Sequence, residues 1–353
     1  MITLKGGLTI GDKSPIRINC NVGCNSIADV EYELSKLRLI QSCNELPDMM
    51  MDLSLIELKE PLYNFIRDRL ELPFGTVLSY HKFTKSKGLQ WPLIKDVLLR
   101  LCADGIAFIT IHFTADMDLF SLATQFRKIP VTSRGGSIVL YDTKKNHREQ
   151  NVFREHIDEI ADIALKFDVV ISLGTTFRPG TILDACDSIH IEETFRQLDI
   201  CRQLQKKGVK VMVENVGHIT LDKLFAHSNL LKKFNAPIMP LGPLPTDIAI
   251  NEDHIANAIG ASFAAYIGCA HVINCITRKE HSEASITDEA TIEAIRTARL
   301  ASHIVDLARN VSEAKKYDMC ITNKRVNNHC CFADGTMCNR CSIVCPLKLN
   351  RND

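Results

Sequence analysis

Short apolar runs recur along the chain, and each is followed by a polar loop and then by a stretch with the 3.6-residue apolar period of a helix. Eight runs predict strands, at residues 16–21, 49–53, 74–80, 107–113, 169–173, 210–214, 236–241 and 270–277. Helical periodicity lies between them, at residues 29–42, 55–70, 89–104, 151–166, 191–207 and 252–266. Strands that alternate with helices pair in parallel through right-handed crossovers. Eight such units over roughly 270 residues are the size of a (β/α)8 barrel.

The alternative fold is a doubly wound open sheet, but no GxGxxG turn opens its first unit. Residues 286–314 continue as one or two helices, and the remainder is polar, with Gly and Cys but little apolar periodicity. We therefore predict an α/β protein with a TIM-like barrel domain over 1–285, a short helical segment over 286–314 and a Cys-rich C-terminal arm over 315–353. Such an arm needs a ligand to hold its structure.

Composition narrows the class of protein. Lys plus Arg and Asp plus Glu both total 42, so the formal net charge is zero, which argues against a nucleic-acid or membrane-surface binder. The first residues carry no basic segment followed by an apolar one, so we expect no secretory signal and a reducing, cytoplasmic location without disulfides. Residues 258–276 are apolar enough to suggest a membrane span, but a buried helix running into a buried strand is the better interpretation.

Cysteine is unevenly distributed, since six of the 14 lie from residue 320 onward. Cys338, Cys341 and Cys345 form a C-x2-C-x3-C-P run whose thiolates can wrap one metal centre. The run fits a structural zinc completed by His329, Cys330 or Cys331. It also fits part of a ferredoxin-like electron-transfer cluster. A third interpretation is a [4Fe–4S] cluster held by three cysteines, with an open iron that coordinates S-adenosylmethionine.

Polar or reactive residues follow the predicted strands one after another. Active sites of barrel enzymes lie at the carboxyl ends of the strands, so these residues are expected to converge on one mouth. They are Asn19, Asn21, Asp52, Tyr80, His112, Arg178, Glu214, His218, Asp247 and His281.

Three sets of residues suggest specific chemistry. The run SRGGS at residues 133–137 lets backbone N–H groups approach an anion, although it also fits a surface turn. Arg178 could clamp an anionic group, or it could pair with Asp184 or Asp187. His218 and His281, with Glu214 nearby, have the chemistry of a metal site with open positions.

Taken in order, the motifs resemble the family of phosphomethylpyrimidine synthase, a radical S-adenosylmethionine enzyme of thiamine pyrimidine biosynthesis, and of its relative 5-hydroxybenzimidazole synthase. The matching runs are INCNVG (18–23), MDLS (51–54), GTV (75–77) with Tyr80, TIH (110–112), SRGGS (133–137), SLG (172–174) with RPG (178–180), Val211 and Met212 with Glu214, Gly217 and His218, LGPL (241–244) with TDIA (246–249), DHI (253–255) and KEH (279–281).

The resemblance implies a radical lyase that forms a carbon-centred radical from S-adenosylmethionine and rearranges aminoimidazole ribotide. It implies a [4Fe–4S] cluster on Cys338, Cys341 and Cys345, an additional Zn or Fe on His218 and His281, and a homodimer in which the arm reaches the partner's barrel. A reductant protein such as flavodoxin or ferredoxin would supply the electron. The residues implied for the ribotide site are Asn21, Met51, Tyr80, His112, Ser133, Arg134, Gly135, Arg178 and Glu214, with Glu214, His112 and Tyr80 as the catalytic groups.

The chain also departs from the family pattern. The last two thiols are separated by three residues where the family has four. Thr175 stands where the family has a substrate-contacting aspartate, and Met239 where it has a tyrosine. The family's Glu-Gly-Pro-Gly-His run is here ENVGH (214–218), and Cys320, Cys330 and Cys331 have no family role. Losing a carboxylate and a phenol changes the polar groups that a substrate can satisfy.

Three functions therefore remain open. The first is a radical lyase acting on aminoimidazole ribotide or a close analogue, with a pyrimidine, a benzimidazole or a new product. The second is a metal-dependent barrel hydrolase or lyase that uses His218 and His281 and has a structural zinc in its tail. The third is a non-catalytic paralogue that binds a nucleotide or a partner.

Overall fold

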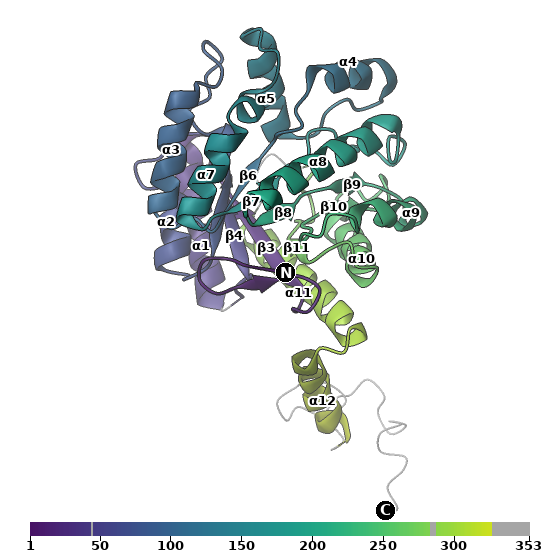
Figure 1. Ribbon diagram of the computed structural model, residues 1–353. Helices are drawn as coiled ribbons and strands as arrows, with labels where there is room; N and C mark the ends of the chain where they lie inside the picture. Colours follow the sequence, from purple (N-terminus) through teal and green to yellow (C-terminus); the bar gives the residue numbers. More distant parts are fainter. Residues whose placement is uncertain (44, 283–286, 327–353) are drawn as a thin grey trace, which may run out of the picture. The chain divides into compact units, whose positions relative to one another are not determined.

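The computed structural model describes residues 1–43, 45–282 and 287–326, and the chain divides into two compact units, Met1–Ser302 and His303–Asp353. The first unit is built on a curled, parallel, seven-stranded sheet wrapped by helices (Figure 1). Its strands, in spatial order, are β11 (Val272–Asn274), β3 (Arg17–Val22), β4 (Met49–Asp52), β5 (Phe74–Val77), β6 (Phe108–Ile111), β7 (Val170–Leu173) and β8 (Val211–Val213).

Residues 237–241 close this sheet into a barrel between its two edge strands. On one side Val213 N donates to Pro237 O (2.9 Å) and Met239 N to Val213 O (2.8 Å). On the other side His271 N donates to Ile238 O (2.8 Å). The segment thus occupies the seventh position, where the sequence predicts a strand, and the eight-unit barrel is confirmed.

The seventh position is nevertheless not the regular strand predicted over 236–241. Pro237 and Pro240 lack the N–H that a ladder needs, so only single bridges form there. The regular strand β10 (Leu241–Leu244) instead lies farther along and pairs in parallel with β9 (Val216–His218) as a separate two-stranded sheet.

The helices of the first unit cover the outside of its barrel, and the predicted ones are present with altered ends. The first unit holds α1 (Val30–Cys43), α2 (Leu62–Asp68), α3 (Trp91–Ala103), α4 (Met117–Phe126), α5 (Arg134–Lys145), α6 (Val152–Glu155), α7 (Ile157–Phe167), α8 (Ser188–Lys206), α9 (Leu221–Leu231), α10 (Asp253–Tyr266) and most of α11 (Asp288–Ala308), with short 3-10 helices at Ile27–Asp29 and Leu78–Tyr80. Helix α12 (Ser312–Val326) belongs to the second unit. Residues 258–276 end α10 and continue into β11. Among the described residues, no helix is both long and apolar enough to cross a bilayer.

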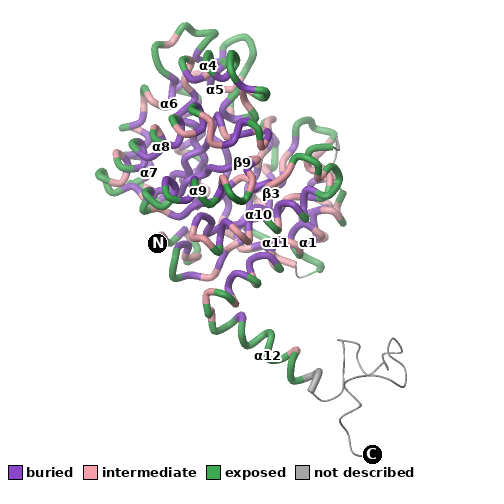
Figure 2. The backbone as a smooth tube through the Cα atoms, turned by 90° about the vertical axis from the view of Figure 1, so that its right-hand side faces the viewer, coloured by how far each residue is buried: buried purple, intermediate pink, exposed green. Residues whose placement is uncertain are grey.

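An N-terminal hairpin fills the bottom of the barrel. Strands β1 (Ile2–Thr3) and β2 (Thr9–Ile10) pair in antiparallel fashion, and Leu4 and Ile10 join the buried cluster inside the strands. Figure 2 shows the buried interior, with exposure confined to the outer faces of the helices and to loops. Apolar side chains therefore fill the end of the barrel that lies opposite the carboxyl ends of its strands.

Asparagine amides tie the strands together near that rim. Asn274 on β11 donates through Nδ2 to Pro240 O (2.8 Å) and accepts at Oδ1 from Asn19 Nδ2 on β3 (2.8 Å). Asn19 also donates to Asn21 Oδ1 (2.9 Å). The Asn274 amide therefore links β11 both to β3 and to the closing segment 237–241, the three strand positions that meet at the barrel closure.

Replacing Asn274 with Leu, which has a similar branched shape, should lower the free energy of unfolding by about 2–4 kcal/mol, because Pro240 O and the Asn19 amide each lose a buried partner. Urea denaturation followed by circular dichroism measures the loss. Asn64→Leu is the control, since the Asn64 amide only donates to Glu60 at the surface (3.3 Å) and should change stability by less than about 0.5 kcal/mol. Equal stability of the two variants would show that the amide does not hold the closure.

Candidate functional site

Five of the sequence-predicted residues meet at the carboxyl ends of β5 to β8. Tyr80 follows β5, His112 follows β6, Arg178 lies in the loop after β7, and Glu214 follows β8. Arg134, at the start of α5, places its guanidinium carbon 5.2 Å from the centre of the Tyr80 ring. Burial raises the pKa of Tyr80, and the charges of Arg134, Arg178 and Glu214 all act on its hydroxyl. The structure therefore brings these groups to one mouth.

His112 is enclosed and neutral. The side chain is 3% exposed, and burial lowers its pKa to about 3. Its Nε2 lies 2.9 Å from Ser133 Oγ, while Nδ1 is buried without a hydrogen-bond partner among the described residues. In the tautomer in which the Ser133 hydroxyl donates to Nε2, Nδ1 carries a proton that only a ligand can accept.

Two glycines make room for that ring. A Cβ on Gly135 would lie 2.4 Å from His112 Cε1, and one on Gly174 would lie 2.8 Å from Nε2. Any larger residue at either position would push the imidazole out of place. The glycines of these two motifs thus serve close packing around His112.

The SRGGS run is the beginning of α5 and not a surface turn. Ser133 is the N-cap, and its Oγ accepts from Gly136 N (3.0 Å). The amides of this first turn and the Arg134 side chain lie beside Tyr80 and His112. A helix N-terminus with a nearby guanidinium favours an anion, which agrees with the predicted role of the run.

Glu214 is 5% exposed, and burial raises its pKa above the ordinary value. Thr110 Oγ1 (2.6 Å) and Ser172 Oγ (3.1 Å) both donate to its Oε1. Arg178 partly opposes the effect of burial. Because the two hydroxyls share one oxygen, neither of these bonds uses Oε2.

Arg178 does not pair with Asp184 or Asp187, the alternative that the sequence leaves open. Arg127 donates two hydrogen bonds of 2.7 Å to the Asp187 carboxylate. Asp184 accepts from the backbone N–H groups of Lys128 (3.2 Å) and Ile129 (3.0 Å). Arg178 donates to Thr175 O (3.1 Å), which folds the side chain back over its own loop. Its remaining donors can serve a ligand in the mouth.

Glu193 on α8, which sequence reasoning missed, shapes the loop that carries Arg178. This buried carboxylate accepts from Thr176 N (2.6 Å), Phe177 N (2.8 Å) and Thr114 Oγ1 (2.6 Å). In the same loop, Thr175 is fully buried, and its hydroxyl has no partner among the described residues. A helix-borne carboxylate at this distance in sequence leaves no local motif by which to find it.

The other predicted site residues lie deeper or to the side. Met51 and Met239 belong to the apolar cluster inside the barrel, at 4% and 1% exposure. Asn21 lies one residue before the end of β3, and its Oδ1 accepts from Asn19 Nδ2. Beside Tyr80, a cavity of about 250 Å³ opens between the loops after β4 and β5, with Asp52 and Arg100 in its wall.

His218 and His281 lie next to each other, each oriented by a carboxylate. Their ring centres are 5.6 Å apart. His218 Nδ1 bonds Asp247 Oδ1 (2.7 Å), and His281 Nδ1 lies 3.2 Å from Asp253 Oδ1. Carboxylates on Nδ1 are the usual outer partners of metal-binding imidazoles, and they leave Nε2 of each ring for the ion. This donor set fits the predicted metal, and the role of Asp247 and Asp253 was not evident from the sequence.

The predicted cluster ligands Cys338, Cys341 and Cys345 lie outside the described residues, as do His329, Cys330 and Cys331. Cys320 is exposed on α12.

Comparison with known proteins gives a consistent result. A family model described as the radical SAM ThiC family matches residues 3–348. The phosphomethylpyrimidine synthase of Carboxydothermus hydrogenoformans is 33% identical over 331 residues, which are 90% of this chain and 76% of that protein. The enzyme of that name from Thermotoga sp. strain RQ2 is 33% identical over 319 residues, 87% of this chain and 74% of that protein. Among solved structures, the dihydropteroate synthase of Xanthomonas albilineans is 12% identical, covering 82% of this chain and 92% of that chain with a TM-score of 0.46.

The buried Glu214 carboxylate makes a prediction about stability and pH. A carboxyl whose pKa is higher in the folded than in the unfolded state stabilises the protein at low pH. This contribution is lost as the pH rises from about 4.5 through the folded-state pKa. Glu214→Gln keeps an acceptor for Thr110 and Ser172 but cannot ionise. Its free energy of unfolding should therefore exceed that of the wild type at about pH 8, with a smaller difference at about pH 5.

Urea denaturation at both pH values measures this difference, with Glu149→Gln on the exposed surface as the matched control. A Glu214→Gln protein that is less stable than the wild type at the higher pH would mean that the ionised carboxylate is well compensated.

Proposed function

The chain belongs to the radical SAM ThiC family, and on that premise we propose that it is a radical S-adenosylmethionine carbon-carbon lyase. Its substrate is 5-aminoimidazole ribotide or a close analogue, and its product is hydroxymethylpyrimidine phosphate for thiamine synthesis. The observation that supports this substrate class is the mouth itself, where Arg134, Arg178 and the N-terminus of α5 surround the neutral His112 and the buried Glu214.

The cationic groups suit a phosphorylated substrate. Arg134 is exposed above the Tyr80 ring and donates to Asn25 Oδ1 (3.0 Å), so it can turn toward an arriving anion at little cost. Arg178 has donors left after its bond to Thr175 O. Charge-assisted hydrogen bonds to phosphate are among the stronger polar contacts, and here they would anchor the ribotide while its ring reaches the floor of the mouth.

The floor supplies the acid–base groups. His112 is neutral at physiological pH, so its Nδ1–H can donate to a ring nitrogen or a carbonyl without giving up a proton. Glu214, with its raised pKa, can hold or accept a proton at Oε2 while Thr110 and Ser172 fix Oε1. Tyr80 closes the side of the mouth beneath Arg134. These residues orient the substrate and exclude water from it.

The family implies an iron–sulfur cluster and S-adenosylmethionine. Cys338, Cys341 and Cys345 would hold a [4Fe–4S] cluster, because three thiolates leave one iron open to the amino acid part of S-adenosylmethionine. When bound, the cluster supplies the electron that cleaves S-adenosylmethionine into methionine and a 5′-deoxyadenosyl radical. His218 and His281, oriented by Asp247 and Asp253, would hold an additional Zn or Fe ion.

The proposal extends to the partners expected from the resemblance. The working unit would be a cytoplasmic homodimer whose C-terminal arm reaches the partner's barrel, with flavodoxin or ferredoxin as reductant. The neutral net charge gives no support for a nucleic-acid partner.

A second candidate, a paralogue that makes a benzimidazole or another product from an imidazole ribotide, is favoured by Thr175 and Met239. The Thr175 hydroxyl is buried without a partner among the described residues, and Met239 presents a thioether within the apolar cluster. Neither can replace the carboxylate and phenol that the family pattern places there, so the substrate ring would meet different polar groups.

The decisive experiment is anaerobic turnover. Protein reconstituted with iron and sulfide is given S-adenosylmethionine, a strong reductant and aminoimidazole ribotide, and the products are identified by mass spectrometry. We expect 5′-deoxyadenosine together with hydroxymethylpyrimidine phosphate, and neither from Cys341→Ala. A different organic product alongside 5′-deoxyadenosine would support the second candidate. A protein that takes up zinc and never iron would contradict both and favour a non-radical metal lyase with a structural zinc tail.

Replacing Arg178 with Lys should raise the Kd for aminoimidazole ribotide about 10- to 100-fold, because a lysine cannot reproduce the planar fork of donors. Anaerobic equilibrium binding to the cluster-loaded protein measures the change. Arg202→Lys, on the exposed face of α8, is the matched control. An unchanged Kd for Arg178→Lys would remove this residue from the ribotide site.

A further inference from the structure

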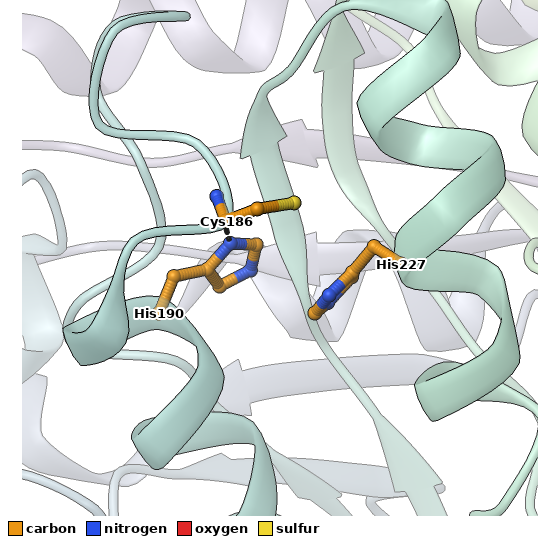
Figure 3. A group of neighbouring side chains, drawn as sticks. All are labelled: Cys186, His190 and His227. Carbon is orange, nitrogen blue, oxygen red and sulfur yellow. Dashed lines mark hydrogen bonds between the residues drawn. The ribbon is translucent and has the colours of Figure 1, made fainter.

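Three potential metal ligands lie together outside the mouth. Cys186 precedes α8, His190 is in its first turn, and His227 is on α9. One ligand atom from each lies within 4.8 Å of the others. His190 and His227 are buried, at 0% and 3% exposure, and their ring centres are 4.4 Å apart. Figure 3 shows the Cys186 sulfur above the gap between the two imidazoles.

Asn215 determines which ring nitrogens carry protons. Its Oδ1 accepts from Val216 N (2.6 Å), and its Nδ2 donates to Gln197 Oε1 (2.8 Å), so the orientation of the amide is fixed. Nε2 of His190 and Nε2 of His227 both lie 3.3 Å from this oxygen. Since Oδ1 can only accept, both Nε2 atoms donate, and the lone pair of each ring is on Nδ1.

Only one of those two lone pairs has a donor within the protein, and a metal ion at His190 Nδ1 would take the place of that donor, the Cys186 N–H. His190 Nδ1 accepts from Cys186 N at 3.2 Å, while His227 Nδ1 is buried with no partner in the described part of the chain. Burial lowers the pKa of His227 to about 4, so the ring is not protonated in its place. An acceptor buried without a donor destabilises the fold, and a metal ion bound to it would remove this penalty.

Cys186 is held in position by its backbone. Its φ of 61° is in the left-handed region, which a non-glycine residue occupies only where neighbouring contacts enforce it. Lys223 on α9 provides them by donating through Nζ to Ile182 O (3.2 Å) and Ala185 O (3.1 Å), directly before Cys186. The strained residue therefore directs its thiol toward the two histidines while α9 holds the loop.

We propose that Cys186, His190 and His227 bind a zinc ion, with water as the fourth ligand on the half-exposed side of Cys186. One thiolate and two neutral imidazoles are a donor set that zinc prefers. On binding, the S–H proton leaves to solvent and a Zn–S bond forms. Ligand atoms of a tetrahedral zinc site lie about 3.3–3.8 Å apart, so the cluster contracts by about 1 Å.

The ion would brace the strand that carries the acid–base floor of the mouth. Asn215, the outer partner of both histidines, directly follows Glu214 and precedes β9, which ends at His218. Through Asn215, the metal would thereby link α8 and α9 to the segment that runs from Glu214 to His218. The three ligands are distinct from the His218–His281 pair, so the proposed site is a second one.

The test measures zinc in full-length, cluster-loaded protein that carries His218→Ala and His281→Ala, so that the other proposed metal site is removed. We expect about one tightly held zinc per chain by mass spectrometry, and a zinc-edge X-ray absorption spectrum with one sulfur and two or more nitrogen or oxygen neighbours. The zinc absorption edge contains no signal from the iron of the cluster.

Introducing Cys186→Ser in that background should remove the sulfur neighbour and most of the zinc, and His227→Gln should also release the zinc. Cys43→Ser, an exposed cysteine on α1, is the matched control and should change neither. Circular dichroism confirms that each variant is folded. Should Cys186→Ser fail to fold, His227→Gln decides the question.

Absence of zinc from the His218→Ala, His281→Ala protein would overturn the proposal, as would zinc retained in both ligand variants. None of these measurements depends on turnover, so they test the zinc site independently of the proposed radical chemistry.

Discussion

The closure of the barrel at residues 237–241 is the constraint on which the site depends. A parallel barrel brings the carboxyl ends of all its strands to one rim only if the sheet closes. Here two residues of the closing segment are prolines, which lack the backbone N–H that would pair with a neighbouring strand. The Asn274 amide compensates by joining Pro240 to Asn19 across the gap. Glu214 and Asn21 lie on opposite sides of this join, and the bridge keeps both at the same rim of the barrel.

Within the mouth, the protein keeps charges that its own side chains do not fully neutralise. Arg178 and Glu214 are both influenced by burial, which lowers the pKa of the first and raises that of the second. Hydroxyl groups and a carbonyl, rather than direct ion pairs, are their hydrogen-bond partners. Elsewhere the chain pairs a buried arginine tightly, as Arg127 does with Asp187. The difference indicates that the donors and acceptors of the mouth are reserved for a ligand, at a cost in stability.

The sequence allowed the barrel and most members of the mouth to be predicted, because apolar runs bounded by turns locate strands and because parallel strands share one rim. Local structure also decides between two interpretations that the sequence left open, because Ser133 caps a helix and does not lie in a surface turn. Long-range pairs could not be foreseen. Asp253 orients His281, and Glu193 holds the loop before Arg178. His227 meets Cys186 because the loop before α8 is bound to α9. No periodicity in the chain links these partners.

The departures from the family pattern are not scattered around the rim. Thr175 follows β7, Asn215 follows β8, and Met239 occupies the seventh position, so all three lie on adjacent barrel positions. On the other side of the mouth, Tyr80 and the SRGGS run keep the family residues and the groups suited to an anion. Under the proposed function, the groups suited to a phosphate are kept, and the changed residues are those that would meet the ring of the substrate. A polar substituent there would meet a threonine and a thioether in place of a carboxylate and a phenol, which favours a less polar ring.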